Sequence, residues 1–240
     1  MASSVEKAIL AFGSITFADE KRSWRWYEEI FRIARDNSKA TIVEVGVALG
    51  GSLAIAGCAL VDSRAHVDSE LIGFDTFDDP FKFTLIDSQS QEFNKQLESE
   101  MNLTFRKGMP VNAWNEVYSV ALQNVRSSGF GGNISLIRGD ASSTVAQFSN
   151  TRSSNFVISA LRISCNWYRP VLTSVKYLVP WVDDDGVILF DGYFFWSGFR
   201  QAVDEVLGTR VESLGVRIGD CLLISGRVAS SLGNSKRKSL

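Results

Sequence analysis

Residues 41–52 read Thr-Ile-Val-Glu-Val-Gly-Val-Ala-Leu-Gly-Gly-Ser, an apolar β-branched run that breaks into glycines. β-Branched residues favour strands, and glycine lets the backbone turn sharply and approach a ligand without a Cβ in the way. A second run, residues 71–77, reads Leu-Ile-Gly-Phe-Asp-Thr-Phe and contains the acid Asp75. A strand, a glycine turn, a helix and a second strand ending in an acid form the layout of a nucleoside-binding crevice. Asp75 would accept the hydroxyl hydrogens of a ribose there.

The rest of the chain alternates between strand and helix patterns. Apolar runs predict strands near 41–46, 70–75, 133–138, 155–163, 186–191 and 219–227, with a weaker one near 209–214. Helical spacing predicts helices near 51–62, 113–127, 142–149, 168–180 and 198–207. This rhythm predicts an α/β fold. We expect a mostly parallel seven-stranded sheet with helices on both faces and a C-terminal antiparallel hairpin at one edge.

The chain of 240 residues suits one α/β domain. Residues 1–38 carry apolar side chains at helical spacing and predict a helical lid or dimer contact, or else an amphipathic helix on the sheet. We assign residues 39–229 to the α/β domain, with an insertion at 78–112 beside the crevice mouth. The tail, 230–240, is rich in Ser, Gly, Asn and Lys, a composition that predicts disorder.

Composition excludes several classes of partner. The formal net charge is −2 with both signs scattered, which argues against nucleic acid. No apolar stretch reaches the roughly 20 residues that span a bilayer, and the N-terminus lacks a signal-peptide pattern. Cys58, Cys165 and Cys221 have no paired spacing and are interpreted as reduced core thiols. We therefore expect a cytoplasmic protein with a small-molecule partner and no membrane contact, with a homodimer through the N-terminal helices as an open alternative.

Several segments, taken in order, resemble the macrocin-type sugar O-methyltransferases, which are class I S-adenosylmethionine (SAM) enzymes of antibiotic biosynthesis. These segments are residues 44–47 with Gly50-Gly51-Ser52, residues 73–77, Trp167-Tyr168, residues 184–193 and residues 202–205. The resemblance covers residues 40–207. It implies a Rossmann-like class I methyltransferase fold and SAM as the cofactor.

The resemblance implies a set of cofactor-binding residues. Glu44, Gly46, Gly51 and Ser52 would line the methionine end of SAM, Asp75 and Thr76 the ribose, and Asp140 and Ala141 the adenine. At the last position the alternative is that Asp140 or Ser142 caps the following helix, since both residue types are preferred there.

The glycine turn itself favours SAM over a dinucleotide. A pyrophosphate needs a tight G-x-G-x-x-G, whereas this turn is G-x-x-x-G-G. Glu44 before the first glycine suits a cationic ligand better than a diphosphate. The alternative is a tight strand-to-helix turn that binds no ligand.

The acids that hold a divalent cation in the family are mostly replaced. The family has Leu-Asp-x-Asp before the Trp/Leu-Tyr pair and Asp-Asp-Tyr after the later strand. This chain has Ile163-Ser164-Cys165-Asn166 and Asp191-Gly192-Tyr193. A Mg²⁺ site relies on carboxylates, so a single remaining acid predicts no metal site. The one histidine, His66, is interpreted as a surface residue away from the crevice.

Asp191 is the predicted catalytic residue, because it ends an apolar strand at the edge of the sheet where α/β proteins bind ligands. It would act as a base or position an acceptor hydroxyl or amine, and the alternative is that it caps the helix near Ser197. Four aromatic residues form a predicted substrate-binding wall for a flat or apolar acceptor or a cation, with core packing as the alternative. They are Trp167, Tyr168, Tyr193 and Trp196.

Three functions are compatible with these patterns. The first is a metal-independent SAM-dependent methyltransferase that modifies a hydroxyl or amine of a small molecule, such as a sugar-bearing or aromatic natural product. The second is a SAM-binding protein of the same fold that no longer methylates, either an isomerase or cyclase or an inactive partner subunit. A nicotinamide-dependent reductase ranks last, because we find no Tyr-x-x-x-Lys pair for proton transfer.

Overall fold

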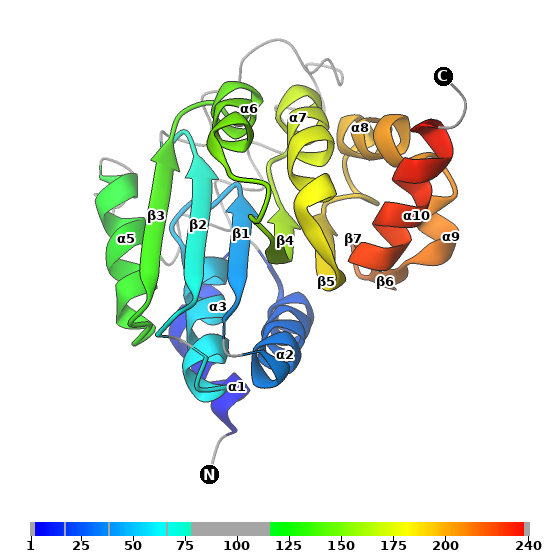
Figure 1. The fold of residues 1–240 in the computed structure, drawn as a ribbon. Coiled ribbons are helices and arrows are strands. Elements are labelled where there is room, and N and C mark those ends of the chain that lie inside the picture. Colours follow the sequence, from blue (N-terminus) through cyan, green and yellow to red (C-terminus); the bar gives the residue numbers. More distant parts are fainter. Residues whose placement is uncertain (1–2, 17, 38, 66, 78–115, 238–240) are drawn as a thin grey trace.

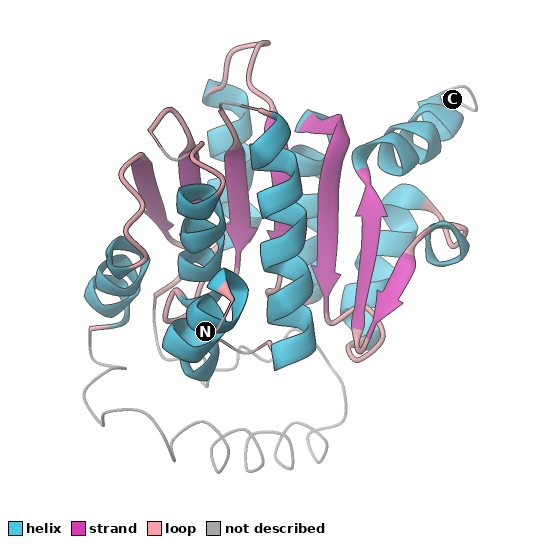
Figure 2. Cartoon of the chain, turned by 90° about the horizontal axis from the view of Figure 1, so that it is seen from below, coloured by secondary structure: helices cyan, strands magenta, loops and turns pink. Residues whose placement is uncertain are grey.

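A computed structural model describes the whole chain except residues 1–2, 17, 38, 66, 78–115 and 238–240. The described residues form one seven-stranded sheet between two layers of helices (Figures 1 and 2). The strands are β1 (Thr41–Val45), β2 (Glu70–Asp75), β3 (Asn133–Arg138), β4 (Ile158–Ile163), β5 (Val182–Asp191), β6 (Val216–Ile218) and β7 (Cys221–Ser225). Their order across the sheet is β3-β2-β1-β4-β5-β7-β6, and neighbours from β3 to β5 are parallel. β7 is antiparallel to both β5 and β6, so the predicted fold class, including the C-terminal hairpin, is confirmed.

The helices divide between the two faces of the sheet. One face carries α1 (Ser4–Phe12), the 3-10 turn η1 (Gly13–Ile15), α2 (Glu20–Asp36), α3 (Gly51–Asp62) and α5 (Val117–Ser127). The other carries α6 (Ala141–Thr151), α7 (Tyr168–Leu178), the 3-10 turn η2 (Val179–Trp181), α8 (Ser197–Leu207) and α10 (Gly226–Arg237), with α9 (Val211–Leu214) beside α10. Each layer encloses its own hydrophobic core against the sheet, as a two-sided parallel sheet requires.

The described part of the N-terminal segment, residues 3–16 and 18–37, folds onto the sheet as an amphipathic pair of helices. In α2 the buried residues include Trp26, Ile30 and Ile33, at the spacing of one helical face. α3, which they cover, is apolar on nearly all sides because α1, α2 and α5 surround it. The segment therefore lies against the first strand-helix unit of the domain. Residues 15, 16 and 26 contact the start of α3.

Two predicted elements near the C-terminus are wrong. The weak strand at 209–214 is occupied by the short helix α9, and β6 follows it at Val216–Ile218. Residues 230–237 of the tail predicted as disordered belong to helix α10, and residues 238–240 lie outside the described residues. Ala229 and Leu232 are buried in the core beside β5, and this burial stabilises a helix that a Ser, Gly and Asn-rich composition disfavours.

Strand β5 starts earlier than the sequence predicts. β5 begins at Val182, four residues before the predicted start, because Asp183, Asp184 and Asp185 continue its extended path with their side chains exposed.

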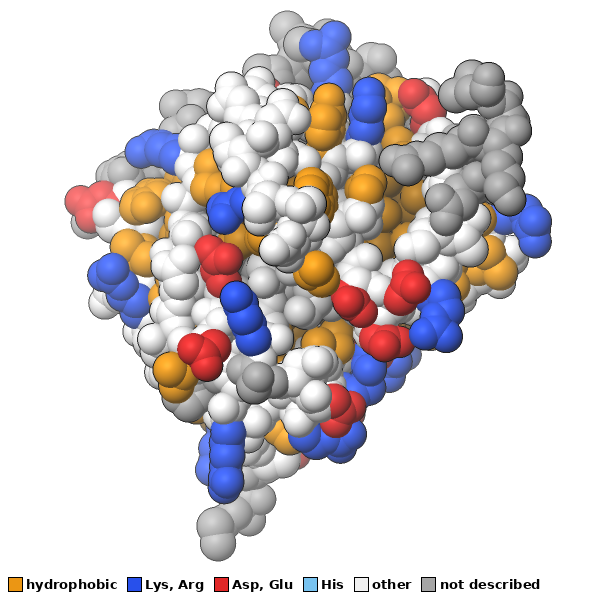
Figure 3. Space-filling model, in the orientation of Figure 1, with side chains coloured by type: hydrophobic (Ala, Val, Ile, Leu, Met, Phe, Trp, Pro, Cys, Tyr) orange, Lys and Arg blue, Asp and Glu red, His pale blue; other side chains and the backbone are white. Residues whose placement is uncertain are grey.

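The predicted insertion at 78–112 and His66 lie outside the described residues. Within the described part of the chain, no helix combines the length and apolar character needed to cross a membrane. Acidic and basic side chains are interspersed on the face drawn in Figure 3.

Candidate active site

The glycine turn after β1 can be made only by glycine at its first position. Gly46 has φ +92°, and its amide donates to the carbonyl of Phe74 on β2 at 2.8 Å. A Cβ on Gly46 would lie 2.7 Å from the backbone nitrogen of Cys165. Gly50, with φ +84°, is the N-cap of α3, and a Cβ added to it would lie 2.8 Å from the carbonyl oxygen of Ala121. The turn therefore brings three backbone segments together at the carboxyl edge of the sheet, where open α/β folds bind ligands.

Asp75 lies beside this turn and is held by two backbone amides. Its Oδ2 accepts from Ala48 N and its Oδ1 accepts from Phe77 N, both at 2.8 Å. Both donors have positive φ, +48° and +52°, a conformation that non-glycine residues rarely adopt. The side chain of Asp75 is half-buried, and that of Thr76 is exposed beside it. The local backbone thus fixes a carboxylate at the carboxyl end of β2, where a ribose would meet it.

The turn after β3 lies against Asp75. The amide of Gly139 donates to the carbonyl of Asp75 at 2.9 Å. Asp140 caps α6, because its Oδ1 accepts from the amide of Ser142 at 2.9 Å and from its hydroxyl at 2.5 Å. The capping role that the sequence left open is therefore present, and the cap places Asp140 and Ala141 near the second strand.

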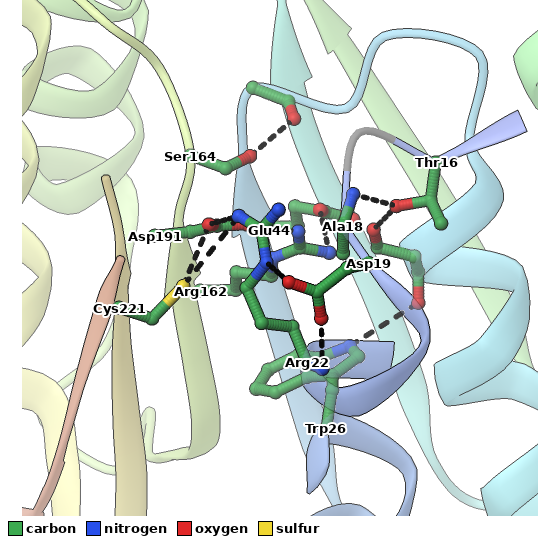
Figure 4. A network of polar contacts seen from close by, with 12 residues as sticks. Thr16, Ala18, Asp19, Arg22, Trp26, Glu44, Arg162, Ser164, Asp191 and Cys221 are labelled. Carbon is green, nitrogen blue, oxygen red and sulfur yellow. Dashed lines mark hydrogen bonds and ion pairs between the residues drawn. The ribbon is translucent and has the colours of Figure 1, made fainter. Parts of the chain in front are cut away.

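A cluster of buried charges spans the face of the sheet that α2 covers (Figure 4). Arg162 of β4 contacts Glu44 of β1 at 3.2 Å and also forms a short ion pair with Asp191 at the end of β5. The second partner of Asp191 is Arg22 of α2, whose Nη1 lies 2.8 Å from its Oδ1. Cys221 of β7 donates its thiol hydrogen to the same oxygen at 2.8 Å. Two carboxylates and two guanidinium groups therefore neutralise one another inside the protein.

Burial and pairing shift the pKa values of this cluster in opposite directions. Burial raises the pKa of Glu44 to about 7, against the attraction of Arg162. Burial acts the same way on Asp191, but Arg162 and Arg22 outweigh it and hold the pKa of this carboxyl below its usual range. Burial and the nearby Asp191 raise the pKa of the Cys221 thiol. Asp191 is therefore an ionised carboxylate with little tendency to take up a proton.

Two atoms of the cluster have no hydrogen-bond partner among the described residues. They are Oε2 of Glu44 and Nε of Arg162, and both are buried. A buried acceptor without a donor costs free energy, so Glu44 fits a site that receives a further donor or cation. Together with the glycine turn and the half-buried Asp75, this unpaired oxygen fits a ligand that carries both a ribose and a cationic amino-acid group. The residues present therefore suit SAM.

The N-terminal segment covers Gly51 and Ser52. The hydroxyls of Thr16 and Ser52 are 2.5 Å apart, and the indole of Trp26 donates to the carbonyl of Ser52 at 3.2 Å. Ser52 is only 5% exposed. The sequence predicted these two residues as cofactor-binding, and they lie at the start of α3 beneath the N-terminal segment.

The predicted aromatic wall is divided between core and surface. Tyr193 is buried, and its hydroxyl donates to Asp204 at 2.6 Å, which is the core alternative. Trp196 is also largely buried, with its ring centre 6.3 Å from that of the half-buried Trp167. Tyr168 donates to Glu205 at 2.6 Å. Tyr193 is therefore a packing residue, and the structure brings Trp167 and Trp196 together.

Asp191 does not cap α8. The N-cap residue of that helix is Trp196, with no side-chain capping hydrogen bond. Asp191 is 7% exposed and faces Arg22, Arg162 and Cys221. The capping alternative is wrong, and Asp191 is a buried member of the charge cluster.

Ser164, which stands where the resemblance led us to expect an acid, has a backbone partner. The hydroxyl of Ser164 donates to the carbonyl of Gly46 at 2.8 Å and so fastens β4 to the glycine turn. Among the described residues there is no group of three or more His, Cys, Asp or Glu side chains that could hold a metal ion.

Sequence reasoning missed Arg22, Arg162 and Cys221. Arg162 could have been found as a single charge inside the apolar run of β4, since a lone buried arginine requires an acid nearby. Its β1 neighbour in the sheet register is Glu44, an equally isolated charge. Arg22 gives no comparable signal, because it lies on a helix with many other charged residues.

A wide hollow of 1310 Å³ lies at the opposite edge of the sheet. Its lining includes Thr41 and Glu70 at the start of β1 and β2, together with Asp183 at the start of β5. None of the predicted site residues lines it. The amino edge of the strands is therefore separate from the site formed by the glycine turn and the charge cluster.

Comparisons with known proteins identify the family of the chain. The family described as Methyltransferase domain matches residues 43–193, which include the glycine turn and Asp191. No curated protein sequence matches the chain. The chain is similar in fold to the O-methyltransferase NovP, with 16% identity, a TM-score of 0.64 and coverage of 88% of this chain and 81% of that one.

Two further structures extend the comparison. The calicheamicin methyltransferase CalS11 has 16% identity and a TM-score of 0.60, with 92% of this chain and 91% of that chain covered. TomG from Streptomyces achromogenes, an O-methyltransferase solved with SAM, has 10% identity and a TM-score of 0.51, with 94% and 90% covered. At these identities the likeness concerns the fold. The family match over more than half of the chain shows that the protein belongs to the methyltransferase domain family, as a SAM-dependent methyltransferase of the Rossmann-like class I fold.

Proposed function

We propose that this methyltransferase modifies a hydroxyl or amine of a small molecule without the help of a divalent metal. The observation that carries the proposal is the charge cluster. Asp191, the one acid left at the end of β5, is paired with the guanidinium groups of Arg22 and Arg162. A carboxylate already neutralised by two cations has little free charge for Mg²⁺, which binds through carboxylates and waters.

The cofactor would supply a methyl group on a sulfonium centre. Asp75 and Thr76 would hold its ribose, and Asp140 with Ala141 would flank its adenine. The methionine end would lie against Gly46, Gly51 and Ser52, with the unpaired Oε2 of Glu44 available to its ammonium group. The two backbone amides that fix Asp75 support the ribose assignment, because its Oδ2 keeps a further lone pair for a hydroxyl hydrogen, while its Oδ1 also accepts from the Thr76 hydroxyl at 3.4 Å.

Asp191 would position groups and would not abstract a proton. Its pKa lies below the usual range because Arg162 and Arg22 stabilise the charged form, whereas a general base works best with a pKa near the operating pH. Methyl transfer from a sulfonium needs above all the alignment of acceptor, methyl group and sulfur, and alignment alone can supply a large share of the rate. An acceptor whose hydroxyl or amine loses its proton readily suits this site.

The acceptor class we propose is a sugar-bearing or aromatic natural product. Trp167 and Trp196 lie together near the carboxyl ends of β4 and β5, and aromatic faces bind flat or apolar rings. Among the structures of similar fold, CalS11 is described as a TDP-rhamnose 3'-O-methyltransferase. Nucleotide sugars are therefore the first acceptors to test with this chain.

The test is a methyl-transfer assay with SAM labelled in its methyl group. The acceptors are nucleotide sugars, glycosylated aromatic compounds, phenols and amines. The protein is assayed after EDTA treatment and again with added Mg²⁺. We expect transfer to one acceptor class at the same rate in both conditions. A rate that collapses with EDTA and returns with Mg²⁺ would refute metal independence.

Asp75→Asn is the matched variant for this assay. An amide keeps the size of the side chain but turns one acceptor into a donor that faces a backbone amide. We expect the affinity for SAM to fall about tenfold or more, with the far-ultraviolet circular dichroism unchanged. Unaltered SAM binding in this variant would remove Asp75 from the cofactor site.

A second candidate function is a SAM-binding protein that does not methylate. The observation favouring it is the weak basicity of Asp191 in its two ion pairs. Tight SAM binding with no S-adenosylhomocysteine formed across the whole acceptor panel would favour this second function.

A further inference from the structure

The segment of the chain that precedes the sheet lies directly on the glycine turn. We call residues 13–16 and 18–26 the N-terminal cover. A Cβ added to Gly51 would lie 2.7 Å from the backbone nitrogen of Thr16 and 2.8 Å from the carbonyl group of Ile15. Backbone therefore meets backbone at the first turn of α3, with no room for a side chain between them.

Side chains of the cover fasten it to the same point. The Thr16 and Ser52 hydroxyls are 2.5 Å apart, and the indole of Trp26, itself 2% exposed, donates to the Ser52 carbonyl at 3.2 Å. Figure 4 shows these contacts on one side of the close-up and Arg22 reaching across to the charge cluster. The cover thus contacts the turn proposed to hold the methionine end of SAM.

A second attachment joins the cover to the far side of the site. At the start of α2, Asp19 forms an ion pair with Arg22: Oδ2 of Asp19 lies 3.1 Å from Nε of Arg22. Its Nη1 reaches Asp191 at 2.8 Å, at the end of β5. β4 lies between β1 and β5 in the sheet, so the cover extends from the glycine turn after β1, past β4, to the end of β5.

We propose that the N-terminal cover must separate from the glycine turn for SAM to exchange, and that the Arg22–Asp191 ion pair holds it closed. The inference rests on the proposed position of the cofactor at this turn. Gly51 and Ser52 are buried under the cover, so a ligand beside the glycine turn can neither enter nor leave past them while the cover is seated. Arg22 is accordingly a positioning residue that acts through Asp191.

A reversible cross-link tests the cover directly. The close approach of the Thr16 and Ser52 oxygens allows a disulfide between cysteines at these positions, since the sulfurs would replace atoms 2.5 Å apart. The double variant Thr16→Cys with Ser52→Cys is oxidised, and wild type treated in the same way controls for the three native cysteines. The association rate of SAM is then measured by stopped-flow tryptophan fluorescence before and after reduction.

We expect oxidation to slow SAM association at least tenfold and reduction to restore it. Oxidation in the presence of SAM should instead trap the cofactor and slow its dissociation by a similar factor. This pair of results distinguishes a closed cover from a damaged site, because a damaged site would not retain SAM. Equal rates in the oxidised and reduced forms would overturn the proposal.

Arg22→Gln tests the ion pair without a cross-link. Arg32→Gln is the matched control, because Arg32 is on the same helix but pairs with Glu29. We expect SAM to dissociate at least tenfold faster from Arg22→Gln than from wild type, with Arg32→Gln unchanged. Equal dissociation from both variants would overturn the role of Arg22.

A measurement without cofactor separates this proposal from the proposed function. Hydrogen exchange of the SAM-free protein reports the opening of the cover alone. We expect the amides of residues 18–26 to exchange at least tenfold faster in Arg22→Gln than in wild type, while those of β1 keep their protection. Unchanged exchange would refute the ion pair as the closure. Failure of wild type to bind SAM would count against the proposed cofactor site and leave this exchange result to decide on the cover.

Discussion

Glu44→Gln should stabilise the protein, and the gain should grow with pH. Glu44 is 1% exposed, with Arg162 at 3.2 Å from one oxygen and no partner for the other among the described residues. Asp191 and Asp75 add repulsion, so burial and these acids together raise its pKa from an ordinary 4.5 to about 7. The folded protein therefore binds a proton at this site more tightly than the unfolded chain does. Wild-type stability contributed by this group is greatest at low pH and is lost as pH rises from about 4.5 through 7.

The magnitude follows from the two pKa values. A rise from 4.5 to about 7, at about 1.36 kcal/mol for each pKa unit, makes ionised Glu44 cost about 3 kcal/mol well above pH 7. Most of this, about 2–3 kcal/mol, is lost between pH 5 and pH 8. Glutamine has the size of a protonated glutamate and never ionises. The variant should therefore exceed wild type in free energy of unfolding by about 1 kcal/mol at pH 5 and about 3 kcal/mol at pH 8.

Urea denaturation followed by circular dichroism at pH 5, 6, 7 and 8 measures this difference. Comparing variant with wild type at each pH cancels the other titrating groups. Asp191→Asn is the contrasting control. Its carboxyl has a pKa below the usual range, so it is ionised in folded and unfolded protein throughout this interval. Introduced into Glu44→Gln, where its repulsion of Glu44 no longer matters, the substitution should destabilise by the same amount at every pH. A stability difference between Glu44→Gln and wild type that does not change from pH 5 to pH 8 would refute the reasoning.

Three further substitutions probe the rest of the site. Arg162→Met removes the cation that neutralises two buried acids, and urea denaturation at pH 8 should show a loss of about 3–5 kcal/mol; a neutral result would mean that water or other groups solvate those acids. Gly46→Ala forces a side chain into φ +92° and against the backbone of Cys165, so stability should fall by about 1–3 kcal/mol from strain alone, as thermal unfolding would report. Tyr193→Phe should cost about 1–2 kcal/mol by loss of the hydrogen bond to Asp204 while the Michaelis constant for the acceptor stays unchanged. A raised Michaelis constant with normal stability would instead return Tyr193 to the acceptor site.

The fold followed from local patterns to a large extent. The β-branched runs at 41–46 and 70–75 predicted β1 and β2 within a residue, because buried parallel strands consist of nearly continuous apolar residues. The tail was mispredicted, since composition alone does not show that Ala229 and Leu232 find a core to enter. Tertiary burial outweighed weak helix propensity there.

The sequence by itself determined the glycine turn and the acid beside it, which are the residues proposed to hold the cofactor. Gly46, Gly50 and Asp75 are local features, because a positive φ and an acid at a strand end are specified by the residues at those positions. The tertiary structure alone decided the charge cluster. Asp191 was identified as the important acid, but its partners are on α2 and β4, 169 and 29 residues away in sequence. A charge in a chain has no fixed pKa until folding brings its partners within a few ångströms, which is why the sequence could not show that Asp191 is paired with two arginines.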